Sequence, residues 1–305
     1  MRGWMWALFL VPLCACSRPE EETAVRGNVT ALVAESYLPL IQREAQEFHQ
    51  LYPDAIVEVR STTTREAIVQ LLNGVVRCIV VDRPLNKEEV SVAQHAKLNV
   101  VDTKIADDAL VVLVNRENKL PSVSLNILES YLQEPADWRS ISQSKLSGRG
   151  ELALTGKNSG AYELLTQHFF TFKSDLNPTI VSESQAGVLE FVATHRRALG
   201  IVSYSFLRDT TRSELEQLKQ AVRILPLHVT DSTGVVTEVK PDQWSIYHHL
   251  YPLSHPLFVY TASKKSGLAE GFSSFVAGQT GQKIIQYASL VPHKIPYRVI
   301  QITQE

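Results

Sequence analysis

The sequence has few cysteines, no long apolar run and almost no excess of charge of either sign. Only one of its three cysteines, Cys78, lies beyond residue 16, and it sits in an apolar run where a buried, inert thiol is expected. The 30 Lys and Arg residues stand against 32 Asp and Glu residues, a formal net charge of −2. A nucleic-acid-binding surface needs an excess of basic residues, so we expect no nucleic-acid partner.

Motifs that would indicate an enzyme or a metalloprotein are also missing. The chain contains no G-x-S-x-G elbow, no G-x-x-x-x-G-K loop, no H-E-x-x-H and no cysteine pair at zinc spacing. His248-His249 and His255 form a small histidine cluster, but adjacent residues of an extended segment point to opposite faces. We therefore expect no catalytic residues, no metal site and no cofactor.

The N-terminal segment is typical of a secretory signal. Arg2 precedes an apolar stretch over residues 4–13, which is too short to span a bilayer as a helix. Leu13-Cys14-Ala15-Cys16 resembles a lipobox; the alternative is an ordinary signal peptide with chance cysteines. We predict a lipoprotein signal peptide over residues 1–15, lipidation at Cys16 and a solvated tether over residues 16–27. The lipid would then be the only attachment to the membrane.

The rest of the chain alternates between strand and helix patterns. Apolar and β-branched runs predict strands over residues 28–34, 55–60, 75–81, 110–114, 151–154 and 201–204. Apolar residues at intervals of three and four predict helices over residues 38–48, 64–72, 125–132, 160–172, 186–199 and 266–290. This alternation predicts an α/β fold with a mainly parallel sheet flanked by helices on both faces.

Small hydroxyl residues follow several predicted strands, at the points where helices begin. Ser36 follows the first strand, Thr64 follows the second, and Asn158, Ser159 and Gly160 open a helix of the second unit. Helix N-termini carry unpaired N–H groups and positive dipole ends, so converging N-termini make an anion site. Each hydroxyl taken alone is explained by plain helix capping. One set in each unit favours a site between two domains.

Short motifs recur in an order that is specific, although each motif is weak by itself. They are Asn73-Gly74, Arg83-Pro84-Leu85, Asp108 before a strand that ends at Asn115, Ser159-Gly160, the strand ending in Gly200-Ile201-Val202-Ser203-Tyr204, Tyr251-Pro252-Leu253, Gly281-Gln282 and Val291-Pro292. From residue 28 to about residue 298 the chain resembles the phosphate-binding proteins of bacterial ABC importers, which have the type II periplasmic binding protein fold.

The resemblance implies two α/β lobes, with a small phosphate-like anion held in the cleft between them and passed to the subunits of an ABC permease. It implies that lobe 1 comprises residues 28–105 plus 261–305 and that lobe 2, residues 106–260, is inserted into it. The chain would cross between lobes near residues 105–107 and 256–260, and the protein would be a monomer.

The sequence also departs from the pattern of this family. The family's first helix turn carries serine and threonine, whereas only Ser36 is kept here and Glu35 precedes it. The aspartate that accepts the proton of hydrogen phosphate corresponds to Arg77, and an arginine that clamps the anion corresponds to Thr155. These assignments predict the loss of a proton acceptor and of a bidentate clamp.

Arginines elsewhere offer replacement charge for a larger or fully ionised anion. The candidates are Arg65, Arg77 and Arg83. For Arg77 the alternative is that it points to solvent and pairs with a nearby acid. The main hypothesis is an envelope lipoprotein that binds phosphate or a related oxyanion for an ABC importer. The alternatives are a binding-fold lipoprotein that no longer binds phosphate and acts as a sensor or envelope interaction module, and an envelope enzyme on the same fold.

Overall fold

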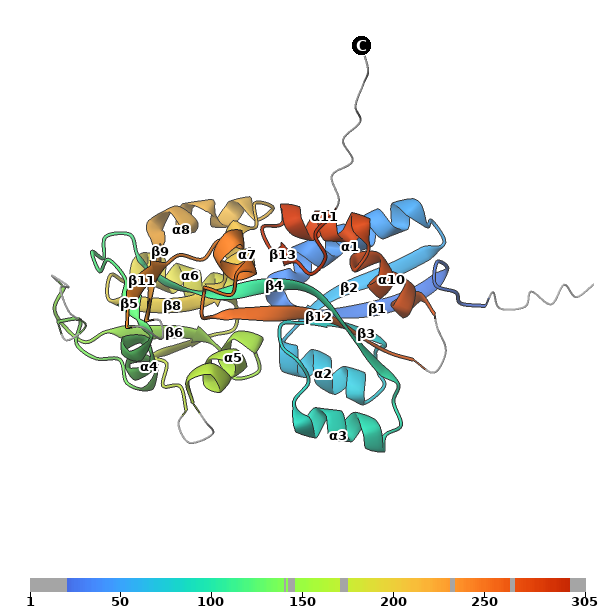
Figure 1. The fold of residues 1–305 in the computed structure, drawn as a ribbon, viewed down its shortest axis with the longest axis horizontal. Helices are drawn as coiled ribbons and strands as arrows, with labels where there is room; N and C mark the ends of the chain where they lie inside the picture. The colour runs from blue at the N-terminus through green and yellow to red at the C-terminus, as the bar shows by residue number, and fades with distance from the viewer. Residues whose placement is uncertain are drawn as a thin grey trace, which may run out of the picture.

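The computed structural model describes residues 21–139, 141, 146–170, 175–230, 234–263 and 267–296. Two lobes lie side by side in Figure 1. We call lobe 1 the half that contains β1, β2 and β3. Its elements are β1 (Gly27–Ala34), the 3₁₀ turn η1 (Glu35–Tyr37), α1 (Leu38–Leu51), β2 (Ala55–Thr62), α2 (Thr64–Leu72), β3 (Cys78–Val81), α3 (Lys87–His95), α10 (Leu268–Val276) and α11 (Gln279–Tyr287).

Lobe 2 is the half that contains β6, β7 and β8. Its elements are β5 (Val123–Ser124), α4 (Leu125–Gln133), β6 (Glu151–Thr155), α5 (Gly160–Phe169), β7 (Ile180–Ser182), α6 (Gln185–Thr194), β8 (Ala198–Ser203), α7 (Tyr204–Arg208), the 3₁₀ turn η2 (Ser213–Leu215), α8 (Glu216–Ala221), β9 (Val222–Leu225), β10 (Leu227–Thr230), β11 (Val236–Val239) and α9 (Gln243–Tyr247).

One continuous sheet passes through both lobes. Its strand order is β2-β1-β3-β12-β4-β8-β6-β7, with β9 and β13 (Val291–Pro292) also paired to β4. β1 runs parallel to β2 and β3, and β6 runs parallel to β7 and β8. The long strands β4 (Val100–Asn115) and β12 (Ser254–Ala262) pair antiparallel in the middle, where they cross between the lobes (Figure 1). The α/β fold is confirmed: each lobe has a parallel set of strands covered by helices.

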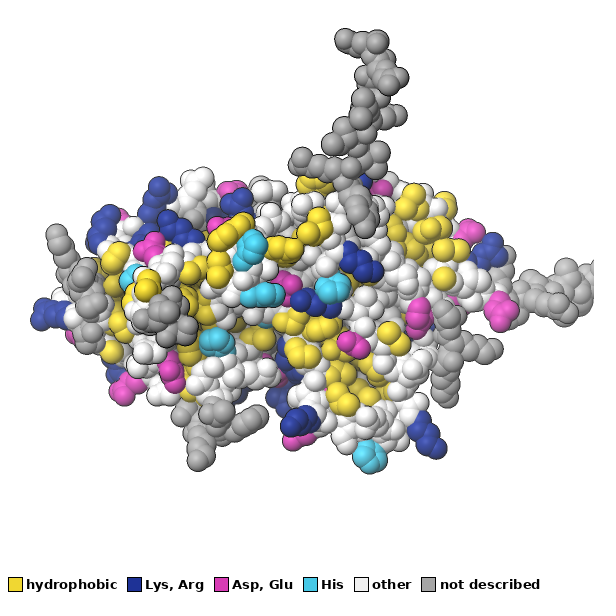
Figure 2. Space-filling model, viewed as in Figure 1, with side chains coloured by type: hydrophobic (Ala, Val, Ile, Leu, Met, Phe, Trp, Pro, Cys, Tyr) yellow, Lys and Arg dark blue, Asp and Glu magenta, His cyan; other side chains and the backbone are white. Residues whose placement is uncertain are grey.

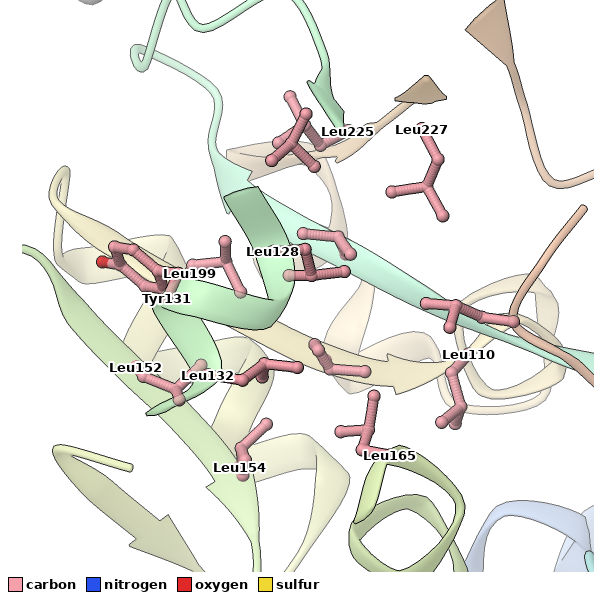
Figure 3. Packing of buried hydrophobic residues seen from close by; sticks show 14 of the residues in the cluster. Leu110, Leu128, Tyr131, Leu132, Leu152, Leu154, Leu165, Leu199, Leu225 and Leu227 are labelled. Atoms are coloured by element: carbon pink, nitrogen blue, oxygen red, sulfur yellow. The ribbon is translucent and has the colours of Figure 1, made fainter. Parts of the chain in front are cut away.

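Helices cover both faces of the sheet in each lobe, as the alternation in the sequence predicts. In lobe 1, α1, α10 and α11 lie on one face and α2 and α3 on the other (Figure 1). In lobe 2, the leucines of α4 and α5 meet those of β6, β8 and β10, and Figure 3 shows them pointing into one shared core. Each such buried side chain stabilises the fold by about 1.5–3 kcal/mol relative to an exposed one.

The core clusters also show where the chain passes from one lobe to the other. Along β4, Ala106 packs in a lobe 1 cluster and Ala109 in a lobe 2 cluster. Along the returning chain, Leu253 packs in lobe 2 and Leu257 in lobe 1. The division at residues 105–106 and 260–261 remains a prediction, since these clusters place the change of lobe without defining a domain boundary.

Several predicted elements differ from the structure, among them the helix predicted over residues 186–199, which ends at Thr194 and is followed by β8 from Ala198. The tail over residues 266–290 is helical as predicted, but it is divided into two helices, α10 and α11, and Gly278 is the N-cap of the second. A Cβ added to Gly281 would lie 2.5 Å from the carbonyl oxygen of Val276, so the chain turns tightly there. The predicted strand over residues 75–81 begins only at Cys78, since Gly74 has a φ of 69° and the chain is still turning.

The predicted solvated tether over residues 16–27 is too long, because its last residues pack on lobe 1. Glu22 accepts hydrogen bonds from both terminal nitrogens of Arg77, each at 2.8 Å, and from the backbone N–H of Leu268 at 3.0 Å. A Cβ on Gly271 would lie 1.8 Å from the carbonyl oxygen of Ala24, so the chain lies directly against α10. The predicted signal peptide and Cys16 lie outside the described residues.

No helix within the described ranges is long and apolar enough to cross a membrane. On the face shown in Figure 2, Lys and Arg side chains are interspersed with Asp and Glu rather than gathered into one patch.

Candidate functional site

A cleft with a cavity volume of about 560 Å³ lies between the lobes. The carboxyl ends of parallel strands line it from both sides: Ala34, Thr62 and Asp82 from lobe 1, and Thr155 and Ser182 from lobe 2. Ligands of open α/β sheets bind at this edge of the strands, because the loops and helix N-termini converge there. Ser36, Thr64 and Ser159 all line the cavity, so the structure brings together the hydroxyls that the sequence indicated.

The lobe 1 wall is built from the start of α2 and the end of β3. Thr63 caps α2 by accepting the N–H of Glu66 at 3.3 Å, which leaves Thr64 as the first helical residue. The Thr64 hydroxyl donates to the carboxylate of Asp82 at 2.6 Å, and both side chains are buried. Asp82 is therefore held in place on the wall with hydrogen-bonding capacity left for a further donor.

The lobe 2 wall is the start of α5. Ser159 is its N-cap and accepts the N–H of Tyr162 at 3.2 Å, while its hydroxyl lies 2.7 Å from that of Thr155. Gly160 is the first helical residue and also lines the cavity. A helix start of this kind presents N–H groups and a positive dipole end to an anion.

A second contact between the lobes lies at the start of α6, beside Ser36. The Gln185 side-chain amide donates to Ser36 and, at 3.1 Å, to Ser203, and its oxygen accepts the N–H of Ser203 at 2.9 Å. Its backbone N–H donates to the Glu35 carboxylate at 3.3 Å. Burial raises the pKa of Glu35, although its bond to Gln185 and the charge of Arg212 act in the opposite direction.

Tyr37, next to Ser36, links the lobe 1 side of the cleft to β4 and β12, the strands that cross between the lobes. Its hydroxyl donates to Asp108 on β4 at 3.0 Å and lies 3.0 Å from Nε2 of His255 on β12. Asp108 also accepts the hydroxyl of Ser205 at 2.5 Å. Burial, with the nearby charge of Asp108, raises the pKa of Tyr37 well above its usual range, so the phenol stays neutral.

The structure does not place the three candidate arginines in the cavity wall. Arg77 lies just before β3 begins, at the end of the strand away from the cleft, and pairs with Glu22. Its assignment as a ligand residue is therefore wrong, and the alternative of a pairing with a nearby acid is confirmed. Arg83 is buried between Glu89 and Glu163 outside the cavity lining.

Arg65 takes part in the contact across the cleft through its backbone. Its N–H donates to the carbonyl oxygen of Asn158 at 3.1 Å, which joins α2 to the turn before α5. Asn158 itself lines the cavity, whereas the exposed side chain of Arg65 does not.

Sequence reasoning missed Asp82, a buried carboxylate that lines the cavity five residues after Arg77. The missed signal was an acidic residue directly after the buried run of residues 78–81, at the carboxyl end of a strand. Lys157 and Gln185 also line the cavity without having been named. Among the described residues no cluster of His, Cys, Asp and Glu has the geometry to hold a metal ion.

Comparison with known proteins agrees with this architecture. The family model of the PBP superfamily domain matches residues 18–280. The chain belongs to the PBP superfamily. Protein SphX from Synechococcus elongatus is 24% identical over 299 residues, covering 94% of this chain and 85% of that protein. The phosphate-binding protein PstS from Staphylococcus saprophyticus is 22% identical over 257 residues, covering 84% of this chain and 75% of that protein.

Solved structures with low sequence identity share the fold. An ABC-type phosphate transport receptor from Vibrio cholerae superposes with a TM-score of 0.67 at 19% identity, covering 86% of this chain and 99% of that one. A structure described as a phosphate ABC transporter substrate-binding protein with bound phosphate, from Clostridium perfringens, gives a TM-score of 0.73 at 17% identity, covering 88% and 100%. The resemblance in the sequence to phosphate-binding proteins of ABC importers is thereby confirmed.

Proposed function

We propose that this protein is an envelope lipoprotein that binds phosphate or a related oxyanion in the interlobe cleft and passes it to an ABC permease. The observation that carries the proposal is the meeting of two helix starts, α2 with Thr64 and α5 with Ser159, around one cavity. The names of the relatives, phosphate-binding protein PstS among them, support the same ligand class. The signal peptide over residues 1–15 and the lipid on Cys16 are part of the proposal.

Hydroxyl and amide groups, rather than arginines, would hold the anion. Ser36 and Ser159 supply hydroxyl donors, and the first N–H groups of α5 add backbone donors, whereas the hydroxyl hydrogen of Thr64 is used to hold Asp82. Asp82 would accept the proton of hydrogen phosphate, because an ionised carboxylate can only accept hydrogen bonds. Sulfate carries no proton at neutral pH, so it would leave this carboxylate facing an anion without a bond between them. The cleft should therefore prefer protonated oxyanions.

A second candidate, a sensor or envelope interaction module without phosphate binding, is favoured by the contact between Glu35 and Gln185. This contact joins the lobes directly, and it places a carboxylate at the start of α6. Glu35 would repel an anion in its ionised form. The two candidates differ in whether any oxyanion stabilises the protein.

Thermal unfolding of the purified protein with millimolar phosphate, sulfate, molybdate and organic phosphates tests the proposal. A ligand at 100 times its Kd adds about 2.7 kcal/mol to the free energy of unfolding, so the Tm rises. Ser159→Ala should remove most of this shift. Ser124→Ala is the matched control, since Ser124 caps α4 away from the cavity and accepts the N–H of Ile127. A Tm that stays constant across all four anions contradicts phosphate binding and favours the second candidate.

The lipid anchor is tested separately with Cys16→Ala and fractionation of cells. Loss of membrane association supports lipidation at Cys16, whereas unchanged association contradicts it.

A further inference from the structure

Arg83 is a charged side chain buried where the two lobes meet. Its side chain is 1% exposed, and it directly follows Asp82 at the end of β3. The two terminal nitrogens of its guanidinium donate to both carboxylate oxygens of Glu89, each at 2.8 Å. Because Glu89 lies in the first turn of α3 and also closes the capping box with Asn86, these bonds hold the guanidinium firmly within lobe 1.

The remaining nitrogen of Arg83 faces the other lobe. Its Nε forms an ion pair with Glu163, which lies in the first turn of α5 in lobe 2. The side chains of Glu89 and Glu163 are 16% and 18% exposed, so water screens neither pair fully. One guanidinium therefore joins a carboxylate of each lobe.

The Arg83–Glu163 pair depends on closure of the cleft. Burial raises the pKa of Glu163, even though the charge of Arg83 acts to lower it. Opening the cleft would return Glu163 to water and leave Arg83 with its lobe 1 partners, Glu89 and the carbonyl oxygen of Pro84. A contact that exists in one conformation and not in the other shifts the equilibrium between them.

The Arg83–Glu163 pair lies next to the candidate site but does not line its cavity. Arg83 is adjacent in sequence to Asp82, and Glu163 lies one helical turn beyond Ser159, so both flank residues of the cavity wall. Arg83 and Glu163 themselves are not among the residues that line the cavity. The pair joins the two walls from outside the cavity.

We infer that Arg83 is a positioning residue, which holds the lobes closed through Glu163 and so sets the affinity for the solute without touching it. The effect on affinity rests on the proposed function, whereas the effect on closure does not. Arg83 thus has a role different from the ligand contact that the sequence suggested.

The experiment compares Glu163→Gln, which weakens the Arg83–Glu163 ion pair between the lobes, with Glu89→Gln, which weakens the Arg83–Glu89 ion pair within lobe 1. Small-angle X-ray scattering of the protein without ligand should give a larger radius of gyration for Glu163→Gln and an unchanged one for Glu89→Gln. Phosphate should bind Glu163→Gln at least about fivefold more weakly, the lower end of typical coupling between conformation and binding, with the difference in the rate of release. Glu89→Gln should lower the Tm and keep the affinity within twofold.

An unchanged radius of gyration and an unchanged release rate in Glu163→Gln would overturn the inference. Glu163→Asp, which keeps the charge but shortens its reach, provides a second variant and should fall between Glu163→Gln and the natural protein. If the natural protein fails to bind phosphate, the proposed function fails, yet a larger radius of gyration in Glu163→Gln still supports the role of Arg83 in closure. If the natural protein binds phosphate and all variants scatter identically, the role of Arg83 in closure is rejected and the proposed function stands.

Discussion

The carboxylate of Asp82, in lobe 1, rests against Gly160, in lobe 2. A Cβ added to Gly160 would lie 1.7 Å from Oδ1 and 2.3 Å from Oδ2 of Asp82, so only a residue without a side chain fits there. The negative charge of Asp82 therefore lies at the start of α5, where the helix dipole stabilises it. The contact between Asp82 and Gly160 therefore shows how closely the two walls of the cleft approach each other.

Gly160→Ala should impair binding by keeping Asp82 and α5 apart. The added methyl group overlaps the carboxylate, so the lobes must separate or Asp82 must leave Thr64. We expect phosphate affinity to fall at least about tenfold, measured by isothermal titration calorimetry, which corresponds to about 1.4 kcal/mol. Gly156→Ala is the control, because the nearest atom to its new Cβ is 3.8 Å away on Val181. Equal affinities in the two variants would contradict the close approach.

Asp82→Asn should change the choice between phosphate and sulfate. The amide oxygen still accepts the hydroxyl of Thr64, so the wall keeps its shape, but the amide nitrogen now donates where the carboxylate accepted. Loss of a hydrogen bond to a charged group is worth about 1.5–3 kcal/mol, which predicts a roughly 10- to 150-fold weaker binding of phosphate. Sulfate should bind better than to the natural protein. Titration of both anions at pH 7 measures the ratio, and an unchanged ratio would exclude Asp82 as the proton acceptor.

Local patterns in the sequence were enough to predict most of the fold. The helix over residues 64–72 matches α2, and the hydroxyls of Ser36, Thr64 and Ser159 come together as expected, although Ser36 lies in the 3₁₀ turn before α1 rather than at a helix start. Periodicity and capping act within a few residues, so they can be read without knowledge of the tertiary structure. The division of the tail at Gly278 was missed because the amphipathic pattern continues through it.

The charged residues of the site could not be assigned in the same way. Whether Arg77 or Arg83 faces the cavity depends on which end of β3 it occupies and on partners far away in sequence, Glu22 and Glu163. Asp82 was overlooked because its place on the wall results from Thr64, a residue on another element. Side-chain partners across lobes are properties of the packed chain rather than of any window of sequence.

Glu22→Ala should loosen the segment over residues 22–26, before β1, from lobe 1. Glu22 accepts the first N–H of α10 and pairs with Arg77. The hydrogen bond from Arg77 is the main cause that lowers the pKa of Glu22, and burial acts in the opposite direction. The pair is partly exposed, so the ion pair contributes little and the helix cap dominates, at about 1 kcal/mol. Urea unfolding measures the loss, and cleavage by a protease within this segment should become faster. Glu21→Ala is the control, because it changes the neighbouring residue and leaves the bonds of Glu22 intact. It should change the free energy of unfolding by less than about 0.5 kcal/mol. Equal effects of the two variants would contradict the role of Glu22 in holding this segment against lobe 1.

Glu44 should make the protein less stable as the pH rises. It lies on α1 with an exposed fraction of 0%, and among the described residues no group hydrogen-bonds to either carboxyl oxygen. Burial raises its pKa to about 9, from an ordinary value of 4.5. Between these two values the unfolded chain releases the proton while the folded chain keeps it. The stabilisation is complete below pH 4.5 and is lost progressively towards pH 9, by up to about 1.4 kcal/mol per pH unit.

Glu44→Gln tests this directly, because the amide has nearly the same shape and does not ionise. Its Tm should exceed that of the natural protein at pH 8 and approach it at pH 5, so that the variant shows the flatter pH dependence. Glu47→Gln, on the same helix but only half-buried, is the control; its charge raises the pKa of Glu44 less than burial does, so this variant should retain most of the natural slope. Parallel curves for all three proteins would mean that Glu44 ionises normally in the folded chain, and the buried, protonated carboxyl would then be excluded.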